Sequence, residues 1–251
     1  MIKKLFAACA LATTVALPAQ ADTLLGLYAG AQAFQMKTDG GFAQDESIAN
    51  FDFEDETNTS FYVALEHPIP LIPNIKIVRT NLDTEGFTQL DATFTFGNEV
   101  YTVDSRLRTT ADLFTTDYIL YYEILDNDVV SIDVGISGKQ IDGDFLVVDA
   151  DTQQRSAEEF SGIIPMVYSR AAVGLPLTGL GAYVEASYLS IDDNSLSDYQ
   201  AAITYNFIES LAIDMTLQAG YRSTTVDLED LDDIYADLEF KGAFVGLEFH
   251  F

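Results

Sequence analysis

The chain has 251 residues, with forty acidic side chains against twelve basic ones, and its formal net charge is −28. Such an acidic protein would repel the phosphates of DNA or RNA, so the composition excludes a nucleic-acid partner. The sequence is also 48% hydrophobic and 12% aromatic, which excludes a disordered acidic tail.

The first 21 residues have the pattern of a secretory signal peptide. Lys3 and Lys4 precede an apolar run at residues 5–17, and Ala19-Gln-Ala21 is a small-x-small cleavage site. We therefore expect residues 1–21 to be removed and residues 22–251 to form one outer-membrane barrel domain. The only cysteine, Cys9, lies in the leader with almost no hydrophobic segment before it, which argues against a lipoprotein. Its removal would exclude disulfides, cysteine metal sites and thiol nucleophiles.

After residue 21, polar and apolar residues alternate with a period of two, which is typical of β-strands. No later stretch approaches eighteen consecutive apolar residues, so a transmembrane helix is not expected. The alternation predicts ten strands. They cover residues 22–36, 59–67, 74–83, 109–125, 129–141, 159–175, 180–191, 197–207, 211–223 and 238–251.

Two of these segments contain a residue that fits a strand poorly. Arg79 continues the apolar face of Ile75 and Ile77, which predicts either a bulge or an early exit from the hydrocarbon. Pro165 forfeits a ladder hydrogen bond, which predicts a bulge or an extension above the membrane.

Short turns and long polar loops alternate between the strands. The turns lie at residues 68–73, 126–128, 176–179 and 208–210, and the long loops at 37–58, 84–108, 142–158 and 224–237, with a shorter loop from residue 192. The loop at 84–108 contains its own alternating piece with Phe94 and Phe96, which predicts a strand extension above the membrane. An even strand number with this alternation places both termini on one side, the periplasmic side. We therefore predict an all-β, antiparallel up-and-down transmembrane β-barrel of ten strands, with eight or twelve as alternatives. Periodicity alone would also fit a soluble sandwich, but the leader, the strand lengths and the aromatic residues near strand ends favour the barrel.

The last eleven residues form the clearest strand. This stretch resembles the carboxy-terminal assembly signal of bacterial outer-membrane proteins, because Gly246 is followed at fixed offsets by Phe249 and Phe251. Phe244 stands where that signal usually has a polar residue. The resemblance implies insertion into the outer membrane by the barrel-assembly machinery, with membrane lipid and lipopolysaccharide as surroundings. The apolar face consists of Ala243, Val245, Leu247, Phe249 and Phe251, and the other face of Gly242, Phe244, Gly246, Glu248 and His250.

Three further stretches are similar to a family of small outer-membrane β-barrel proteins of marine and related Gram-negative bacteria. They are residues 120–127 (LYYEILDN), 174–180 (GLPLTGL) and 231–242 (LDDIYADLEFKG). The similarity runs over most of the mature chain. The family has no activity to carry over, so the resemblance implies fold and location and no catalytic residue.

Charged residues of both signs fall on the polar face of the predicted strands. About ten strands enclose a lumen that side chains can largely fill. Because buried charges need partners, we expect an ion-pair network that plugs the lumen. The alternative is a narrow, cation-preferring path for passive diffusion of small solutes. The predicted lumen-lining residues are Glu66, Lys76, Asp117, Glu123, Asp133, Lys139, Arg170, Glu185, Asp214 and Arg222.

Acidic residues also gather in the predicted loops. Clustered carboxylates suit Ca²⁺ or Mg²⁺, which would bridge the loops to lipopolysaccharide phosphates and make the chain a surface-interaction protein. The spacing matches no complete EF-hand loop, so a solvated acidic surface is the simpler interpretation, and no other cofactor is predicted. The candidate residues are Asp52, Glu54, Asp55, Asp192, Asp193, Asp230, Asp232 and Asp233.

The two histidines argue against an enzyme. Known outer-membrane hydrolases and acyltransferases use a histidine base near the outer rim or in the membrane plane, and omptin-like proteases place an Asp–His pair in an outer cleft. His67 adjoins the proline-rich turn and His250 is next to last, so both are expected at the periplasmic end. Acids alone could perform glycosidase-like chemistry, but no pair stands out among forty. We predict a non-enzymatic barrel with a structural role or passive passage of small solutes, and we disfavour a hydrolase.

Overall fold

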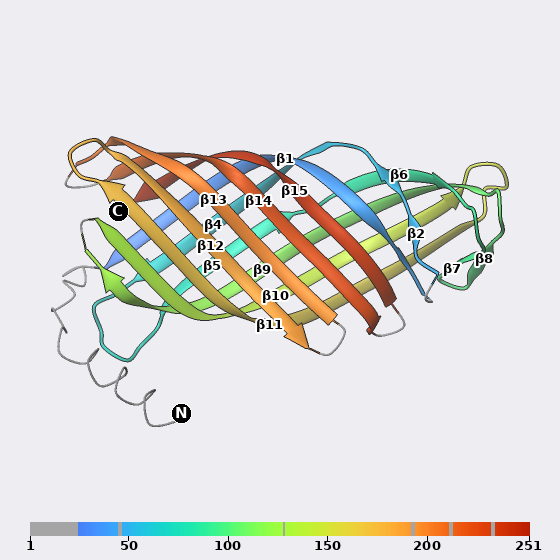
Figure 1. Ribbon diagram of the computed structural model, residues 1–251, viewed down its shortest axis with the longest axis horizontal. Coiled ribbons are helices and arrows are strands. Elements are labelled where there is room, and N and C mark those ends of the chain that lie inside the picture. The colour runs from blue at the N-terminus through green and yellow to red at the C-terminus, as the bar shows by residue number, and fades with distance from the viewer. Residues whose placement is uncertain (1–24, 45–46, 128, 192–193, 211–212, 232–233) are drawn as a thin grey trace, which may run out of the picture.

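The computed structural model describes residues 25–44, 47–127, 129–191, 194–210, 213–231 and 234–251. Within these residues, ten long strands form the wall of a barrel (Figure 1). The remaining short strands are β2 (Ala49–Asn50), β3 (Asp52–Phe53), β6 (Thr84–Gln89), β7 (Phe94–Phe96) and β8 (Glu99–Tyr101). The wall strands are β1 (Gly26–Ala43), β4 (Glu56–Glu66), β5 (Asn74–Asn81), β9 (Arg106–Asp126), β10 (Val130–Asp149), β11 (Arg155–Leu175), β12 (Leu180–Ile191), β13 (Asn194–Ile208), β14 (Asp214–Leu231) and β15 (Ile234–His250).

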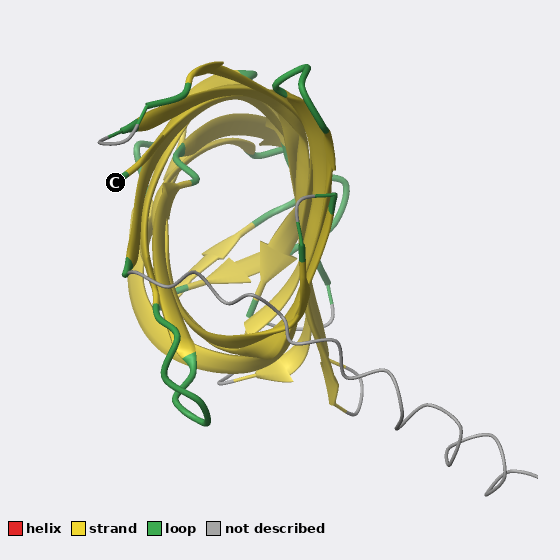
Figure 2. Ribbon diagram, turned by 90° about the vertical axis from the view of Figure 1, so that its left-hand side faces the viewer, coloured by secondary structure: helices red, strands yellow, loops and turns green. Residues whose placement is uncertain are grey.

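The wall closes on itself. Each wall strand pairs antiparallel with the next one along the chain, and β15 returns to pair with β1. The Phe251 amide donates to the Leu27 carbonyl at 2.9 Å, which fastens the last residue to the first strand. Figure 2, which looks into one end of the barrel, shows the resulting ring. The predicted antiparallel barrel of ten strands is confirmed for the described part of the chain.

The two ends of the barrel differ. The short turns and Phe251 lie at one end, which we call the turn end, and the long hairpins with β6, β7 and β8 lie at the other, which we call the extension end (Figure 1). No helix among the described residues is long and apolar enough to cross a membrane.

Several segments that the sequence predicted as long loops are instead paired strands. The β10–β11 ladder continues to Val148↔Arg155, and the β14–β15 ladder reaches Leu231↔Ile234. β1 continues to Ala43, and β6 pairs with the extended end of β9. The loop predictions for 142–158 and 224–237 were therefore wrong over most of their length, and those for 37–58 and 84–108 in part. Inward apolar residues such as Val147 and Ala236 continue the alternation in these segments, and the neighbouring acids obscure it.

The two poorly fitting residues are accommodated differently. Pairing on both sides of β5 runs through Arg79 without a register shift, which excludes the bulge and leaves the early exit from the hydrocarbon as a prediction. The guanidinium carbon of Arg79 lies 4.0 Å from the centroid of the Phe114 ring. The β10–β11 ladder likewise passes through Pro165 without a shift. Pairing between β11 and β12, however, ends two residues away, at Val167↔Tyr188. β11 therefore continues past Pro165 as an extension of the wall.

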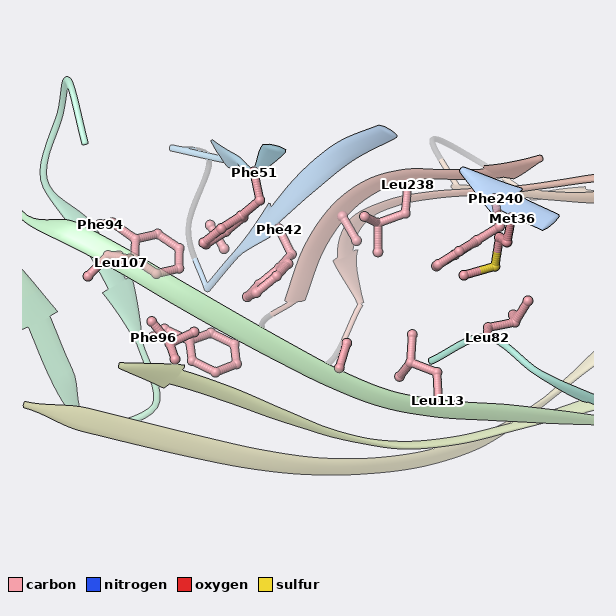
Figure 3. Packing of buried hydrophobic residues seen from close by; sticks show 14 of the residues in the cluster. Met36, Phe42, Phe51, Leu82, Phe94, Phe96, Leu107, Leu113, Leu238 and Phe240 are labelled. Carbon is pink, nitrogen blue, oxygen red and sulfur yellow. The ribbon is translucent and has the colours of Figure 1, made fainter. Parts of the chain in front are cut away.

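The two faces of the wall have opposite character. Large apolar side chains cover the outside, where Val167, Ile203 and Val245 are 68%, 67% and 60% exposed. The residues between them point inward and are mostly buried. At the extension end the interior is an apolar cluster, in which Phe42, Phe96, Leu113, Leu238 and Phe240 point into the lumen from β1, β7, β9 and β15 (Figure 3). Nearer the turn end the interior is polar.

Candidate functional site

Lys139 of β10 lies at the centre of a buried ion-pair cluster inside the barrel. Its Nζ is 2.7 Å from the Asp117 carboxylate of β9 and 2.8 Å from that of Asp198 of β13. The Lys139 side chain is only 1% exposed. β9 is the direct neighbour of β10, but β13 is three strands away along the wall. The second ion pair therefore bridges across the lumen instead of along the wall.

Arg222 of β14 extends this cluster to the opposite wall. Its Nη2 and Nε donate to the two oxygens of Asp198 at 2.7 and 3.0 Å, the bidentate geometry that makes arginine–carboxylate pairs strong. Its Nη1 donates to the Thr80 hydroxyl of β5 at 3.0 Å, and that hydroxyl lies 2.9 Å from the Ser60 hydroxyl of β4. A continuous polar chain thus runs from β10 to β4.

A second set of ion pairs crosses the lumen beside the first. The Nζ of Lys76 on β5 lies 2.7 Å from Glu185 on β12, and both side chains are largely buried. Arg170 of β11 lies 3.6 Å from Asp133 on β10 and 3.7 Å from the same Glu185. Glu185 therefore joins strands from opposite sides of the barrel.

These ion pairs balance in charge. Among the described residues, the two sets contain four carboxylates and four cations, so their formal charges cancel. Burying a charge is costly unless a partner and hydrogen bonds compensate for lost water, and each of these groups has a partner. We call this set the polar layer; it consists of Lys76, Asp117, Asp133, Lys139, Arg170, Glu185, Asp198 and Arg222.

Neutral donors hold a further group of carboxylates. The Tyr62 hydroxyl donates to Glu248 at 2.5 Å, and the Tyr121 hydroxyl donates to Glu66 at 2.7 Å. The Asn74 amide donates to Glu123 at 3.3 Å. These carboxylates belong to residues near the turn-end limits of their strands. The surplus negative charge that the sequence predicted inside the barrel therefore lies beside the polar layer and not within it.

Amide side chains and tyrosine hydroxyls form a hydrogen-bond network beside the layer, and this network includes the Glu248 carboxylate. Gln218 donates to the Tyr62 hydroxyl at 3.0 Å and accepts from Gln32 at 3.0 Å. The amide of Gln200 donates to the Tyr183 hydroxyl at 3.2 Å. These contacts join β1, β4, β12, β13 and β14 in one network. Neither Gln32 nor Gln218 was singled out from the sequence, because a neutral amide has no charge that would indicate a partner of opposite charge.

The polar layer separates two larger spaces. It encloses a cavity of about 30 Å³, enough for one or two water molecules. On the turn-end side lies a vestibule of about 400 Å³, whose lining includes Tyr183, Gln218 and Glu248. On the extension-end side lies a chamber of about 380 Å³, which has Lys139 in its lining and otherwise mainly apolar walls. The lumen is thus an hourglass with a polar constriction.

The structure brings together seven of the ten predicted lumen residues in the polar layer: Lys76, Asp117, Asp133, Lys139, Arg170, Glu185 and Arg222. Glu66 and Glu123 lie at its turn-end side. Asp214 does not join it; its carboxylate lies 3.6 Å from Nδ1 of His250 at the turn end. Asp198, which binds both Lys139 and Arg222, was missing from the prediction although it faces inward in the strict alternation of its strand.

Neither histidine lies near the extension end. The His250 ring stacks on Tyr28 at a centroid distance of 4.2 Å, and the backbone amide of Ile69 donates to His67 Nδ1 at 3.3 Å. Both contacts are at the turn end.

Only four of the eight candidate cation-binding acids lie within the described residues. Asp52, Glu54 and Asp55 are exposed, and Asp55 lies 3.6 Å from Lys37. Asp230 belongs to β14, whereas Asp192, Asp193, Asp232 and Asp233 lie outside the described residues. In the part of the chain that the structure describes, no three His, Cys, Asp or Glu residues form a group that could hold a metal ion. Cation binding by the loops stays a prediction.

The predicted assembly signal forms the turn-end half of β15. Gly246 pairs with Gln32 on one side and Gln218 on the other, and the rings of Phe249 and Phe251 stack with centroids 6.5 Å apart. Phe244, the departure from the usual pattern, is 3% exposed and points into the lumen. The role of this stretch in assembly stays a prediction.

No family model and no curated protein sequence matches the chain, so the family resemblance also stays a prediction. Among solved structures, the chain is similar to the transport unit of the autotransporter AIDA-I from Escherichia coli, with 9% identity, a TM-score of 0.40 and coverage of 94% of this chain and 93% of that one. It is also similar to the CymD monoaromatic hydrocarbon channel, with 7% identity, a TM-score of 0.30 and coverage of 90% and 87%. The Pseudomonas putida toluene transporter TodX matches with 7% identity, a TM-score of 0.30 and coverage of 96% and 93%. These similarities carry no argument about the function of this chain.

Proposed function

We propose that the chain is an integral outer-membrane β-barrel protein whose lumen is closed by the polar layer and whose role is structural. The observation that carries this proposal is the charge-balanced layer, which leaves a cavity of only about 30 Å³ between the two larger spaces. A solute larger than water would have to break buried ion pairs in order to pass.

The outer surface supports a membrane location. Soluble proteins rarely expose a large continuous apolar surface, whereas a membrane barrel needs one toward lipid and satisfies its backbone hydrogen bonds by closing. Aromatic residues near the turn-end limits of the strands, such as Tyr205 and Phe207, fit an interfacial belt. The leader-like residues 1–21 and the assembly-like carboxy terminus favour the outer membrane, with the turn end in the periplasm.

A conductance measurement tests the closed lumen. The purified protein, inserted into planar bilayers, should give no resolved current steps under salt and voltage at which an open porin conducts. Replacing Lys139 with Ala removes the centre of the layer, so K139A should conduct. Lys241, whose side chain is 32% exposed and whose amine pairs with Asp39, provides the matched control, and K241A should stay silent. Steps in the unaltered protein would refute the closed lumen.

Passive passage of small solutes is the second candidate function. The hourglass shape favours it, because a wide space on each side brings solute close to a thin barrier. Since the charges of the layer cancel, such a path would discriminate by size more than by the sign of charge. Liposome swelling with a series of uncharged sugars would support this candidate if the rate falls with sugar size, and equal rates with and without protein would exclude it.

We further propose that the protein is not an enzyme. This proposal rests on the two histidines, which lie at the turn end among backbone and aromatic contacts. Hydrolysis of phospholipid, peptide or glycoside reporters by the purified barrel, lost on mutation of an interior carboxylate, would contradict it.

A further inference from the structure

The chamber on the extension-end side of the polar layer has the composition of a binding pocket. Its walls come from β1, β7, β9, β10, β11, β13, β14 and β15, and they include Phe42, Phe96, Phe145, Phe160 and Phe240. Pockets for small ligands are usually apolar, with a few polar groups, and have volumes of about 300–1,000 Å³. The chamber, at about 380 Å³, lies in that range. It is more than twice the size of a cavity of about 150 Å³ that binds benzene.

The wall beside this chamber is incomplete. β11 and β12 pair only from Val167↔Tyr188 to the turn between them, and β12 ends at Ile191. Within the described residues, the outer half of β11 therefore has no ladder partner on that side. Residues 158–161 from this edge line the chamber together with Leu196 of β13 and Val226 of β14. Within the described residues, pairing on this side stops at Tyr188, so the chamber lies beside an unpaired edge of β11.

The charges around the chamber decide which kind of molecule it suits. Lys139 is the cation in its lining, but Asp117 and Asp198 already neutralise this amine, so it offers no free positive charge. Glu158 and Glu159 line the chamber on the β11 edge. An anionic ligand would meet two carboxylates without a compensating cation, whereas a neutral apolar molecule would lose little on leaving water. A lipid acyl chain attached to a phosphate headgroup would face the same repulsion.

We propose that this chamber is a binding site for a free, uncharged, small apolar molecule, such as an aromatic hydrocarbon. The binding site does not depend on passage through the polar layer, because the chamber can fill while the layer stays closed. The proposal therefore goes beyond the proposed function and can fail independently of it.

The sequence allows a clean optical test, because the chain contains no tryptophan. Phe160→Trp places a single indole in the chamber wall, which we call the chamber reporter. Tyr188→Trp places one on the outer surface, where the tyrosine is 55% exposed, and we call it the surface reporter. Each protein is reconstituted in phosphatidylcholine nanodiscs and titrated with bromobenzene, a neutral heavy-atom quencher. We expect saturable quenching of the chamber reporter that ethylbenzene reverses by competition. The surface reporter should show only linear quenching by bromobenzene dissolved in the bilayer, without competition.

Two further titrations separate the charge and the source of the ligand. Anionic 4-bromobenzoate should bind in the chamber at least about tenfold more weakly than bromobenzene, because its carboxylate would lose its hydration in an apolar pocket and would lie near two like charges. Glu158→Gln combined with Glu159→Gln should reduce that difference. Nanodiscs made with brominated acyl chains should quench the surface reporter and leave the chamber reporter nearly unchanged. Strong quenching of the chamber reporter by those lipids would mean that an acyl chain fills the chamber, and would overturn the proposal.

A filled chamber provides the negative control. Ala236 lines the chamber and is 5% exposed, so Ala236→Phe in the Phe160→Trp background should occupy part of its volume. Saturable quenching should then disappear while the heat-dependent shift in gel mobility that marks a folded barrel remains. The proposal is refuted if the response of the chamber reporter to bromobenzene is linear, or if Ala236→Phe folds and binds as before.

Discussion

Lys139 offers the sharpest test of how the barrel interior is stabilised. Its side chain is 1% exposed, and its amine lies within 2.8 Å of the Asp117 and Asp198 carboxylates. Lys139→Met keeps much of the length of the side chain and removes its charge. Asp198 then still has Arg222, but Asp117 loses the cation that it contacts. The substitution therefore leaves a buried carboxylate without an ion-pair partner.

The expected cost follows from the asymmetry between burying an ion pair and breaking one. Replacing a whole buried pair by apolar groups is often nearly neutral, whereas removing one partner typically costs about 3–5 kcal/mol. We therefore expect Lys139→Met to lower the free energy of unfolding by about 3–5 kcal/mol. The double variant with Asp117→Asn should recover part of that loss, because no unpaired carboxylate then remains on β9.

Reversible urea unfolding of the barrel in lipid vesicles, followed by tyrosine fluorescence, provides the measurement, and the four proteins of the cycle give the coupling energy. The control is Arg106→Ala, which removes an ion pair with Asp151 at the extension end, where the two side chains are 64% and 52% exposed. Solvent screens that pair, so its loss should change stability little. A cost below about 1 kcal/mol for Lys139→Met, or no recovery in the double variant, would refute the reasoning.

Two further predictions concern the extension end and strand packing. Backbone amides, first that of Thr152, hold the pKa of Asp149 below its usual range at the tip of the β10–β11 hairpin. Because this pKa is depressed, the ionised Asp149 carboxylate stabilises the folded hairpin tip at any pH above the pKa of an unfolded aspartate. That stabilisation is lost as the pH falls through the lower pKa of the folded state. Amide hydrogen exchange at the hairpin tip, corrected for the intrinsic effect of pH, should therefore accelerate in acid. Asp149→Ala should show this faster exchange already at neutral pH. An unchanged exchange rate in the variant would contradict the role of the Asp149 carboxylate in holding the tip. A Cβ on Gly242 would lie 1.8 Å from the Gln35 carbonyl oxygen, so Gly242→Ala should lower the free energy of unfolding in urea by about 1–3 kcal/mol. Ala243→Val, on the outer face, is the control and should lower it less. Equal costs for the two variants would show that β1 and β15 can separate without penalty.

The charge balance of the polar layer changes how the acidity of this protein should be understood. The sequence has far more acids than bases, and a lumen lined by the surplus would favour cations. The cross-lumen pairs are instead matched one for one, and the carboxylates of Glu66, Glu123 and Glu248 are held by hydroxyl and amide donors beside them. The excess carboxylates thus lie outside the constriction, where they can attract an approaching cation without forming part of the barrier.

The sequence by itself determined the properties that depend on neighbouring residues along one strand. Period-two alternation assigns each side chain to a face, so the ten wall strands, the apolar exterior and the inward direction of Lys139 and Arg222 were all predictable. The turn residues located the short connections well, because proline and glycine act within a few positions. The long hairpins were missed because acids such as Asp142 and Glu158 masked an alternation that continued through them.

Only the tertiary structure decided which inward residues meet. Asp198 and Lys139 are 59 residues apart and lie on strands that are not neighbours. Their contact depends on the register of every intervening strand and on the width of the closed ring, since strand tilt, register and size are linked in a barrel. The chamber and the unpaired edge of β11 depend on where ladders end and how strands converge. Alternation fixes a side chain's direction within its strand; closure of the barrel fixes its partner.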